Sequence, residues 1–221
     1  MFEAVASLAP LRRAASAPAT GKALPATAAG ALIGPNAVLQ TVAVMEAALG
    51  KQRTRAVLAD AQITQLPSGT EMIAEIHALR LHRWLALHEP VACFDIAEEA
   101  GARTADYIIA HRIPRAACWL LQHLPARGAA PLLMAAIRKH AWTFAGAGAF
   151  TPHSAWAFTI DRGAARDALM PPDSLFHWYA AVFTRLYQTL VAPDCVCRIV
   201  AGAAPSPDVR RYAITRSAAG L

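Results

Sequence analysis

The segment His140-Ala-Trp-Thr-Phe-Ala-Gly-Ala-Gly-Ala-Phe150 lies where helical patterning ends and strand patterning begins. Large rings alternate with small residues along it, and Gly146 and Gly148 leave one face without side chains. Glycine in a strand allows a ligand or another element to approach the backbone closely. The segment therefore predicts either a surface for a flat apolar ligand or tight packing between a helix and a sheet.

Upstream of this segment, apolar residues recur at steps of three and four and predict six helices. The predicted ranges are about 36–49, 51–62, 70–87, 89–111, 115–124 and 129–141. Gly50 is placed to end the first of these helices. Pro114 ends the fourth, because the residue before a proline avoids the helical region of backbone conformation.

Downstream of the same segment the apolar period changes. The predicted elements are strands at 142–150 and 154–161 with a turn at Thr151-Pro152-His153, a helix at 173–191, and strands at 195–202 and 209–216. The order of helices, hairpin, helix and hairpin predicts an α+β fold, in which one helix-rich domain packs on a small antiparallel sheet. Aromatic residues on several sides of helix 173–191 predict burial of both its faces, either in a homodimer or within the chain.

Composition narrows the class of protein. The chain has 221 residues, of which 56% are hydrophobic and 16% are charged, and its net charge is +6. The basic residues are scattered along the sequence, which argues against a nucleic-acid partner. No apolar run is long enough to span a membrane. Residues 1–30, rich in alanine and proline, predict a flexible tail, and residues 31–221 predict a single ligand-binding domain.

Four cysteines occur without a CxxC pair, which predicts reduced thiols in a cytoplasmic protein. Peripheral attachment to a membrane is the alternative location. Cys195 and Cys197 fall on one face of a predicted strand. No neighbouring residues complete a set of four zinc ligands, so we interpret both as core residues.

Two histidines share the apolar stripes of their helices, namely His111 and His140. Each is either a hydrogen-bonded core residue or an axial ligand to the metal of a tetrapyrrole. Arg112 and Arg138 are close to them in sequence. These arginines are either solvated or placed to pair with acidic groups at the edge of an apolar ligand.

Motifs for redox cofactors are missing from the sequence. Gly146-Ala-Gly148 lacks the third glycine and the following helix of a dinucleotide loop. No P-loop, no GxSxG motif and no cysteine spacing for an iron–sulfur cluster occurs. The residues therefore indicate no means of holding a hydride or electron donor and favour a binding protein over an enzyme.

Three motifs resemble a known family. Ile33-Gly-Pro-Asn36, Thr104-Ala-Asp-Tyr-Ile-Ile-Ala-His-Arg-Ile-Pro114 and Ala141-Trp-Thr-Phe-Ala-Gly-Ala-Gly148 are similar to the J-protein family of bacteriochlorophyll synthesis, which carries the 4-vinyl reductase domain. The resemblance covers about residues 32–217. It implies an α+β ligand-binding fold like that of certain vesicle-tethering subunits and aromatic-sensing regulators. Some relatives bind zinc through cysteines and a carboxylate, a pattern that Cys195 and Cys197 do not reproduce.

The resemblance implies a place in the magnesium branch of tetrapyrrole synthesis. Its name implies reduction of a vinyl group, but such a reduction needs a bound donor of electrons. We therefore expect a carrier that holds magnesium protoporphyrin or its monomethyl ester, has no cofactor of its own, and works beside the magnesium chelatase large subunit and the magnesium-protoporphyrin methyltransferase. The alternatives are a vinyl reductase and a scaffold subunit that binds no ligand.

The expected pocket combines these candidate residues between the helices and the sheet. Aromatic and glycine residues would hold the ring, a histidine would bind its magnesium, and an arginine would pair with a propionate. The residues are Trp142, Phe144, Gly146, Gly148, Trp156, Phe158, His140 or His111, and Arg112 or Arg138.

Overall fold

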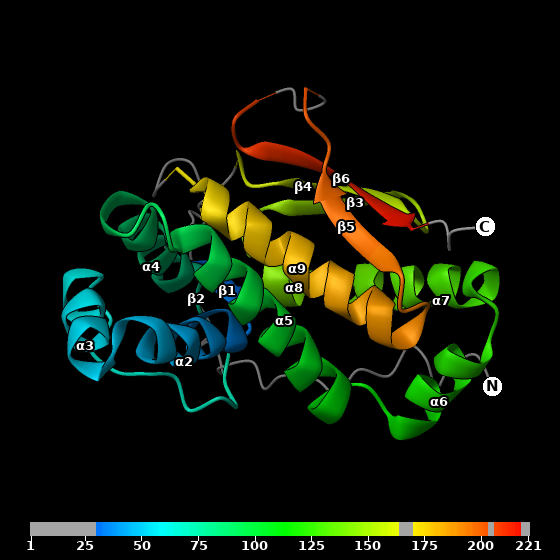
Figure 1. Ribbon diagram of the computed structural model, residues 1–221, viewed down its shortest axis with the longest axis horizontal. Coiled ribbons are helices and arrows are strands. Elements are labelled where there is room, and N and C mark those ends of the chain that lie inside the picture. Colours follow the sequence, from blue (N-terminus) through cyan, green and yellow to red (C-terminus); the bar gives the residue numbers. More distant parts are fainter. Residues whose placement is uncertain (1–29, 164–169, 203–205, 218–221) are drawn as a thin grey trace, which may run out of the picture.

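Two long helices, α5 (Cys93–His111) and α9 (Asp173–Leu190), pack along each other at the centre of the fold (Figure 1). The computed structural model describes residues 30–163, 170–202 and 206–217. A four-stranded sheet covers one side of α9, and α2 (Asn36–Leu49) packs on the far side of α5. The described chain thus forms layers in the order sheet, α9, α5 and α2.

Smaller elements close the two ends of these layers. The helices are α3 (Lys51–Asp60), α4 (Glu75–His88), α6 (Arg115–His123), α7 (Ala126–Lys139) and the single turn α8 (Trp142–Ala145). Strands β1 (Leu32–Ile33) and β2 (Ile73–Ala74) form a separate antiparallel pair. Figure 1 places α3 and α4 at one end of the molecule and α6 and α7 at the other.

The main sheet has the order β3-β4-β6-β5, and all of its neighbouring strands are antiparallel. The strands are β3 (Ala149–Ser154), β4 (Ala157–Asp161), β5 (Cys195–Ile199) and β6 (Val209–Arg216). Phe158 pairs with Tyr212 across the two central strands. The predicted α+β class, with two hairpins separated by a long helix, is confirmed. Cys195 and Cys197 are both buried on β5, as the core interpretation requires.

The predicted strand 142–150 is wrong in its first half. Residues from Trp142 to Ala145 form the helical turn α8, and β3 begins at Ala149. The chain reverses at Gly146, whose φ of +57° is rarely adopted by residues with a side chain. A hydrogen bond from the following backbone N–H to the carboxylate of Glu75 holds this reversal. The apolar pattern of residues 142–150 could not indicate this contact, because Glu75 is far away in the sequence.

The predicted turn at residues 151–153 is also misplaced, because the hairpin turns at Ala155 and Trp156. Pro152 lies inside β3, with a register shift between Pro152 and Ser154. Proline has no backbone N–H to donate to a neighbouring strand. It is tolerated in β3 because this strand lies at the edge of the sheet and has a partner strand on one side only.

Several helix boundaries also differ from the predictions. Helix α4 begins at Glu75 rather than near residue 70, because the residues just before it pair with β1. Strand β5 ends at Ile199, before the predicted residue 202. Apart from Gly30, the predicted tail lies outside the described residues.

The core between α9 and the sheet is a stack of aromatic rings. Phe158 lies between Phe183, at 4.0 Å between ring centroids, and Tyr212, at 4.7 Å. The remaining rings of α9, including Trp178 and Tyr187, are buried as well. Coverage of α9 within the chain therefore accounts for aromatic residues on several of its sides, and the homodimer stays a prediction.

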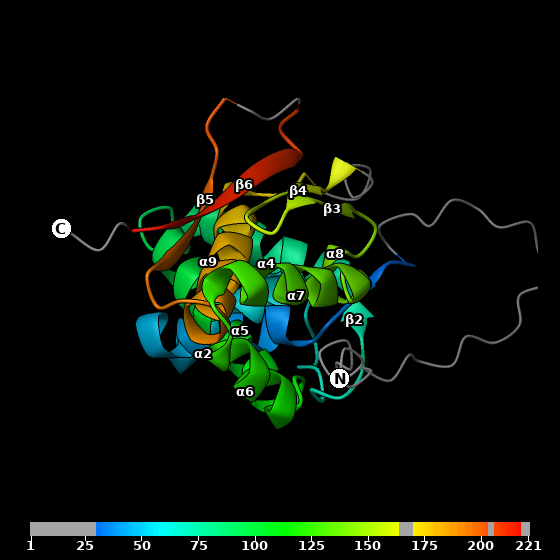
Figure 2. The same ribbon diagram turned by 90° about the vertical axis from the view of Figure 1, so that its right-hand side faces the viewer.

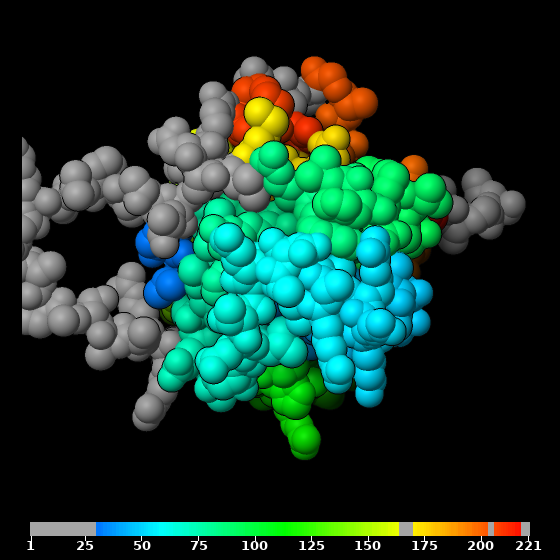
Figure 3. Space-filling model, turned by 90° about the vertical axis from the view of Figure 1, so that its left-hand side faces the viewer, coloured from blue at the N-terminus to red at the C-terminus, as the bar shows by residue number. Residues whose placement is uncertain are grey.

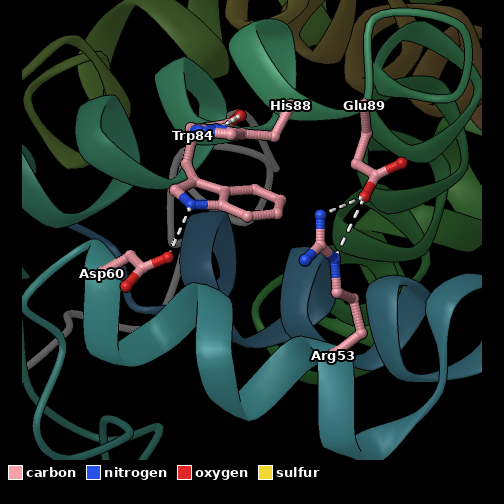
Figure 4. Close-up of polar contacts among 5 residues, drawn as sticks. All are labelled: Arg53, Asp60, Trp84, His88 and Glu89. Carbon is pink, nitrogen blue, oxygen red and sulfur yellow. Dashed lines mark hydrogen bonds and ion pairs between the residues drawn. The ribbon is translucent and has the colours of Figure 1, made fainter.

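A polar cluster joins α3 to the corner between α4 and α5 (Figure 4). The guanidinium of Arg53 forms an ion pair with Glu89 at 3.1 Å and lies 5.0 Å from the centroid of the Trp84 ring. The indole N–H of Trp84 donates to Asp60 at 3.2 Å, and His88 stacks on the same ring. These contacts fix α3 on the rest of the fold.

The close packing of α5 on α9 depends on Gly101, and this gives a stability prediction. A Cβ at this position would lie 2.5 Å from the carbonyl oxygen of Trp178 and 2.8 Å from Cβ of Ala181. We expect Gly101→Ala to lower the free energy of unfolding by about 1–3 kcal/mol, measured by urea denaturation.

The matched control is Gly128→Ala on α7, where an added Cβ would meet no atom within 4 Å. That change should raise stability by about 0.5–1 kcal/mol, because alanine loses less backbone entropy in a helix. Equal effects of the two substitutions would contradict the packing argument.

Candidate functional site

A cavity of about 130 Å³ lies among the helices, next to α8. Most of its lining residues are apolar. Helix α9 supplies the largest share, such as Val182, and α2, α4, α5 and α7 contribute others, such as Ala37 and Ile108. Phe144 from α8 also contributes to the wall. The expected pocket lay between the helices and the sheet. The structure corrects this position. None of the residues of β4 lines the cavity, and Arg162, which does, follows the end of that strand.

The polar part of the lining is a buried ion pair. Nη2 of Arg162 lies 3.1 Å from Oε2 of Glu75, and their side chains are 2% and 0% exposed. Arg162 also donates through Nη1 to the carbonyl oxygen of Ala145, and Oε2 of Glu75 accepts from the backbone N–H of Ala147 at 2.9 Å. The pair therefore ties α4 and the end of β4 to both sides of the reversal at Gly146.

Three buried polar atoms of residues that line the cavity have no hydrogen-bond partner among the described residues. They are Oε1 of Glu75, Nε of Arg162 and Nε1 of Trp178. An unpaired buried polar atom costs about 1–3 kcal/mol. The residues that line the cavity thus carry one acceptor and two donors that no described residue satisfies.

Gly146 and Gly148 pack against this ion pair. A Cβ on Gly146 would lie 1.5 Å from Oε2 of Glu75. A Cβ on Gly148 would lie 2.3 Å from the carbonyl oxygen of Asp161 and 3.3 Å from Cδ of Arg162. The sequence allowed two interpretations of these glycines, a surface for a flat ligand and close packing. The structure supplies contacts for close packing. Neither glycine lines the cavity.

The rim of the cavity is formed by its partly exposed residues, which include Arg112, His140 and Trp142. The side chain of Arg112 reaches the carbonyl oxygen of Gly69 at 3.5 Å and lies over the ring of Tyr107 at 5.7 Å. Trp142 is 42% exposed. The rim therefore combines a cation, an imidazole and an exposed indole.

His140 lines the cavity and makes one hydrogen bond to the backbone. Its Nδ1 lies 2.9 Å from the carbonyl oxygen of Ala136, which can only accept, so Nδ1 carries a hydrogen and, in the neutral imidazole, the lone pair is on Nε2. This is the tautomer that metal-binding histidines adopt when their second nitrogen donates to a backbone carbonyl.

The structure brings together four of the predicted residues, Trp142, Phe144, His140 and Arg112. The others lie outside the lining of the cavity. Trp156 packs on Tyr187 at 5.8 Å between ring centroids, Phe158 belongs to the ring stack, His111 is exposed beside Tyr107, and Arg138 is exposed on α7.

Sequence reasoning missed Glu75 and Arg162. For Glu75 a signal existed, because it shares a helix face with Ala78 and Leu79, and an acid within an apolar stripe is unusual. Arg162 follows a strand and has no such signal. The side chain of Tyr179 completes the surroundings by donating from its hydroxyl to the carbonyl oxygen of Phe144 at 2.9 Å. Burial raises the pKa of Tyr179, which keeps this donor protonated.

Neither a cluster of metal-binding side chains nor a membrane-spanning helix occurs in the part of the chain that the structure describes. No group of three His, Cys, Asp or Glu side chains is arranged to hold a metal ion among residues 30–163, 170–202 and 206–217. Within the same ranges, no helix has the length and apolar character needed to cross a bilayer.

The ion pair gives a second stability prediction. Glu75→Ala leaves the guanidinium of Arg162 buried without its counter-charge, so we expect a loss of about 3–5 kcal/mol in the free energy of unfolding. The control is Glu99→Ala, which removes an exposed ion pair to Arg103 at 2.7 Å and should cost less than about 1 kcal/mol. Urea denaturation of both variants checks this, and similar losses would contradict the assigned role.

The buried histidine His82, which the sequence did not single out, should make the free energy of unfolding depend on pH. It is fully buried, with Nδ1 3.3 Å from Oγ of Ser174, and burial lowers its pKa to about 4. Between pH 6.5 and 4 the unfolded chain binds a proton on His82 that the folded chain does not. This term therefore makes stability fall as the pH is lowered through that window, by at most about 1.4 kcal/mol per pH unit.

The measurement is urea denaturation of wild type and His82→Gln at pH 7, 6, 5 and 4. The neutral variant should show a shallower loss below pH 6.5, whatever its stability at pH 7. Parallel curves for the two proteins would remove His82 as the origin of the pH dependence.

Comparison with solved structures places the fold among H-NOX proteins. The H-NOX protein from K. algicida in its unliganded Fe(II) form, and a mutant of it, match with TM-scores of 0.51 and 0.52 at 11% sequence identity. Each match covers 84% of this chain and 97% of the other. At this identity the likeness concerns the fold alone, which agrees with the α+β class.

Comparison of sequences is more specific. The bacteriochlorophyll synthase 23 kDa chain of Cereibacter sphaeroides is 39% identical over 184 residues, which cover 81% of this chain and 88% of that protein. The chain of the same name in Rhodobacter capsulatus is 39% identical over 164 residues, which cover 73% and 76%. No protein-family model matches the sequence, so the 4-vinyl reductase identity stays a prediction of the resemblance. The chain belongs to the family of bacteriochlorophyll synthase 23 kDa chains, and it is therefore a protein related to bacteriochlorophyll biosynthesis.

Proposed function

We propose that this protein is a carrier that binds a magnesium porphyrin intermediate of bacteriochlorophyll biosynthesis. In this role it would accept magnesium protoporphyrin or its monomethyl ester and pass it between the magnesium chelatase large subunit and the methyltransferase. The observation that carries the proposal is the apolar cavity whose rim holds His140 and Arg112. Membership of the 23 kDa chain family supplies the biosynthetic context.

The chemistry of the cavity suits such a ligand. Apolar walls favour a flat hydrophobic ring, and Nε2 of His140 keeps the lone pair that an axial ligand to magnesium needs. The guanidinium of Arg112, which forms no ion pair among the described residues, is available for a propionate at the rim. No covalent or redox step is required for this function.

The size of the cavity sets a condition on the proposal. Pockets for drug-sized ligands measure about 300–1,000 Å³, and this cavity measures about 130 Å³. A macrocycle therefore enters only if α8 moves outward. That movement breaks the hydrogen bond from Gly34 N to Thr143 O at 2.7 Å and the one from the hydroxyl of Tyr179 to Phe144 O. It also strains the hydrogen bond from Arg162 to the carbonyl oxygen of Ala145, which holds the end of α8 to the buried ion pair.

The test is a titration of the full chain with magnesium protoporphyrin, followed by the Soret band and by quenching of tryptophan fluorescence. We expect saturable binding with a shifted Soret band, and His140→Ala should remove the shift because the axial ligand is lost. The matched control is His123→Ala. The Nδ1 atom of His123 faces the carbonyl four residues earlier, as in His140, but His123 does not line the cavity.

Absence of saturable binding would overturn the carrier and favour a scaffold. Ethyl product formed from a divinyl substrate in excess over protein, with reduced nicotinamide or flavin under anaerobic conditions, would favour a reductase instead. Equal Soret shifts in wild type and His140→Ala would remove His140 as the axial ligand.

A further inference from the structure

The charges of this protein are distributed unevenly along the sequence. The chain contains 15 acidic residues, yet none occurs from Tyr107 to Ile160. The same segment carries several cations, namely Arg112, Arg115, Arg127, Arg138 and Lys139. Counted without histidines, every formal charge in this quarter of the chain is positive, and the carrier function uses only one of these cations, Arg112.

The fold places two helices of this segment, α6 and α7, at one end of the molecule. Figure 2 looks onto that end, where α6 and α7 lie next to each other, and Figure 1 shows these two helices at its right-hand side, with α8 nearer the middle. The two acids that border the segment are engaged. Oδ1 of Asp106 pairs with Nε of Arg185 at 2.7 Å, and Oδ1 of Asp161 accepts from the N–H of Gly163.

The cations at this end lie on exposed helical stripes. On α7, the exposed positions include Arg127, Pro131, Ala135 and Arg138, which follow each other at steps of four, four and three. Lys139 is exposed at the end of the same helix. None of these three cations forms an ion pair with an acid in the described part of the chain, whereas arginines elsewhere pair with Glu89, Glu99 or Asp194.

Helix α6 adds an aromatic residue to the basic surface. Its exposed positions include Arg115, Trp119 and His123, spaced by four residues, and the ring of His123 stacks on that of Trp119 at 4.4 Å. The indole of Trp119 is 61% exposed. Trp142, on α8 at the rim of the cavity, is also exposed. Tryptophan is the residue that settles at the boundary between lipid headgroups and hydrocarbon.

We propose that the end formed by α6 and α7 is a docking surface for an anionic lipid bilayer. Unpaired cations attract the negative headgroups, and the exposed indole of Trp119 inserts among them. An acidic protein would also satisfy the cations. The bilayer is the partner favoured by the residues, because Trp119 is exposed on a helix that carries no acid and lies beside the exposed cations of α7, a combination that suits the interfacial region of an anionic bilayer. This inference is independent of the carrier function, since it concerns binding without any porphyrin.

The experiment is flotation of the full chain with vesicles of phosphatidylglycerol and phosphatidylcholine, compared with vesicles of phosphatidylcholine alone. We expect binding to the anionic vesicles only, with weakening as salt rises from 50 to 500 mM, because screening shortens the reach of the charges. The double variant Arg127→Glu, Arg138→Glu should bind at least about tenfold more weakly. Trp119→Ala should weaken binding without changing its dependence on salt.

The control is the double variant Arg55→Glu, Arg83→Glu. These exposed arginines belong to α3 and α4, which form the opposite end of the molecule shown in Figure 3. This variant changes the net charge by the same amount and should bind as wild type does, which separates a defined surface from general attraction. Circular dichroism of each variant establishes that it is folded.

Three outcomes would overturn the proposal. They are equal flotation with neutral and anionic vesicles, equal weakening by both double variants, and no flotation at 50 mM salt. A different result would identify a protein partner and exclude the bilayer. In that case the wild-type protein does not float but binds an acidic protein, and the double variant Arg127→Glu, Arg138→Glu loses this binding. Because no porphyrin is present, these outcomes leave the carrier proposal to its own titration.

Discussion

The buried ion pair between Glu75 and Arg162 is the interaction on which the region around the cavity depends. It joins the first residue of α4 to the residue that follows β4, and its hydrogen bonds reach the backbone of Ala145 and Ala147 on either side of Gly146. A charge in a protein interior is tolerated only when a counter-charge and further hydrogen bonds compensate for the lost water. Removing any member of this arrangement therefore affects helix, sheet and loop together.

This arrangement also explains the short helix α8. The chain leaves α7, makes one further turn, and reverses at a glycine because a side chain there would occupy the space of the Glu75 carboxylate. Helix α8 then closes one side of the cavity, with hydrogen bonds to Gly34 and to the hydroxyl of Tyr179. The last residue of α8 is also held by the hydrogen bond from Arg162 to the carbonyl oxygen of Ala145, so the buried ion pair limits how far this wall can move. The carrier proposal requires movement at this position.

The two ends of the molecule differ in chemistry. At one end, Arg53 lies over the buried ring of Trp84 and forms an ion pair with Glu89. At the other end, α6 and α7 expose cations without acids and an unburied indole at Trp119. The rim of the cavity is connected to this second end through His140, the residue that caps α7.

The amino-acid sequence alone was enough to predict the fold class and most of the elements, because α2, α7 and β6 bury one face each and carry the matching apolar period. It also placed His140, Trp142, Phe144 and Arg112 in the candidate site. Tertiary structure decided the rest. The reversal after α8, the exclusion of Phe158 from the cavity, and the pairing of Glu75 with Arg162 all depend on partners far away in the sequence. Periodicity reports which face of an element is buried, but it carries no information about which distant side chain will meet that face.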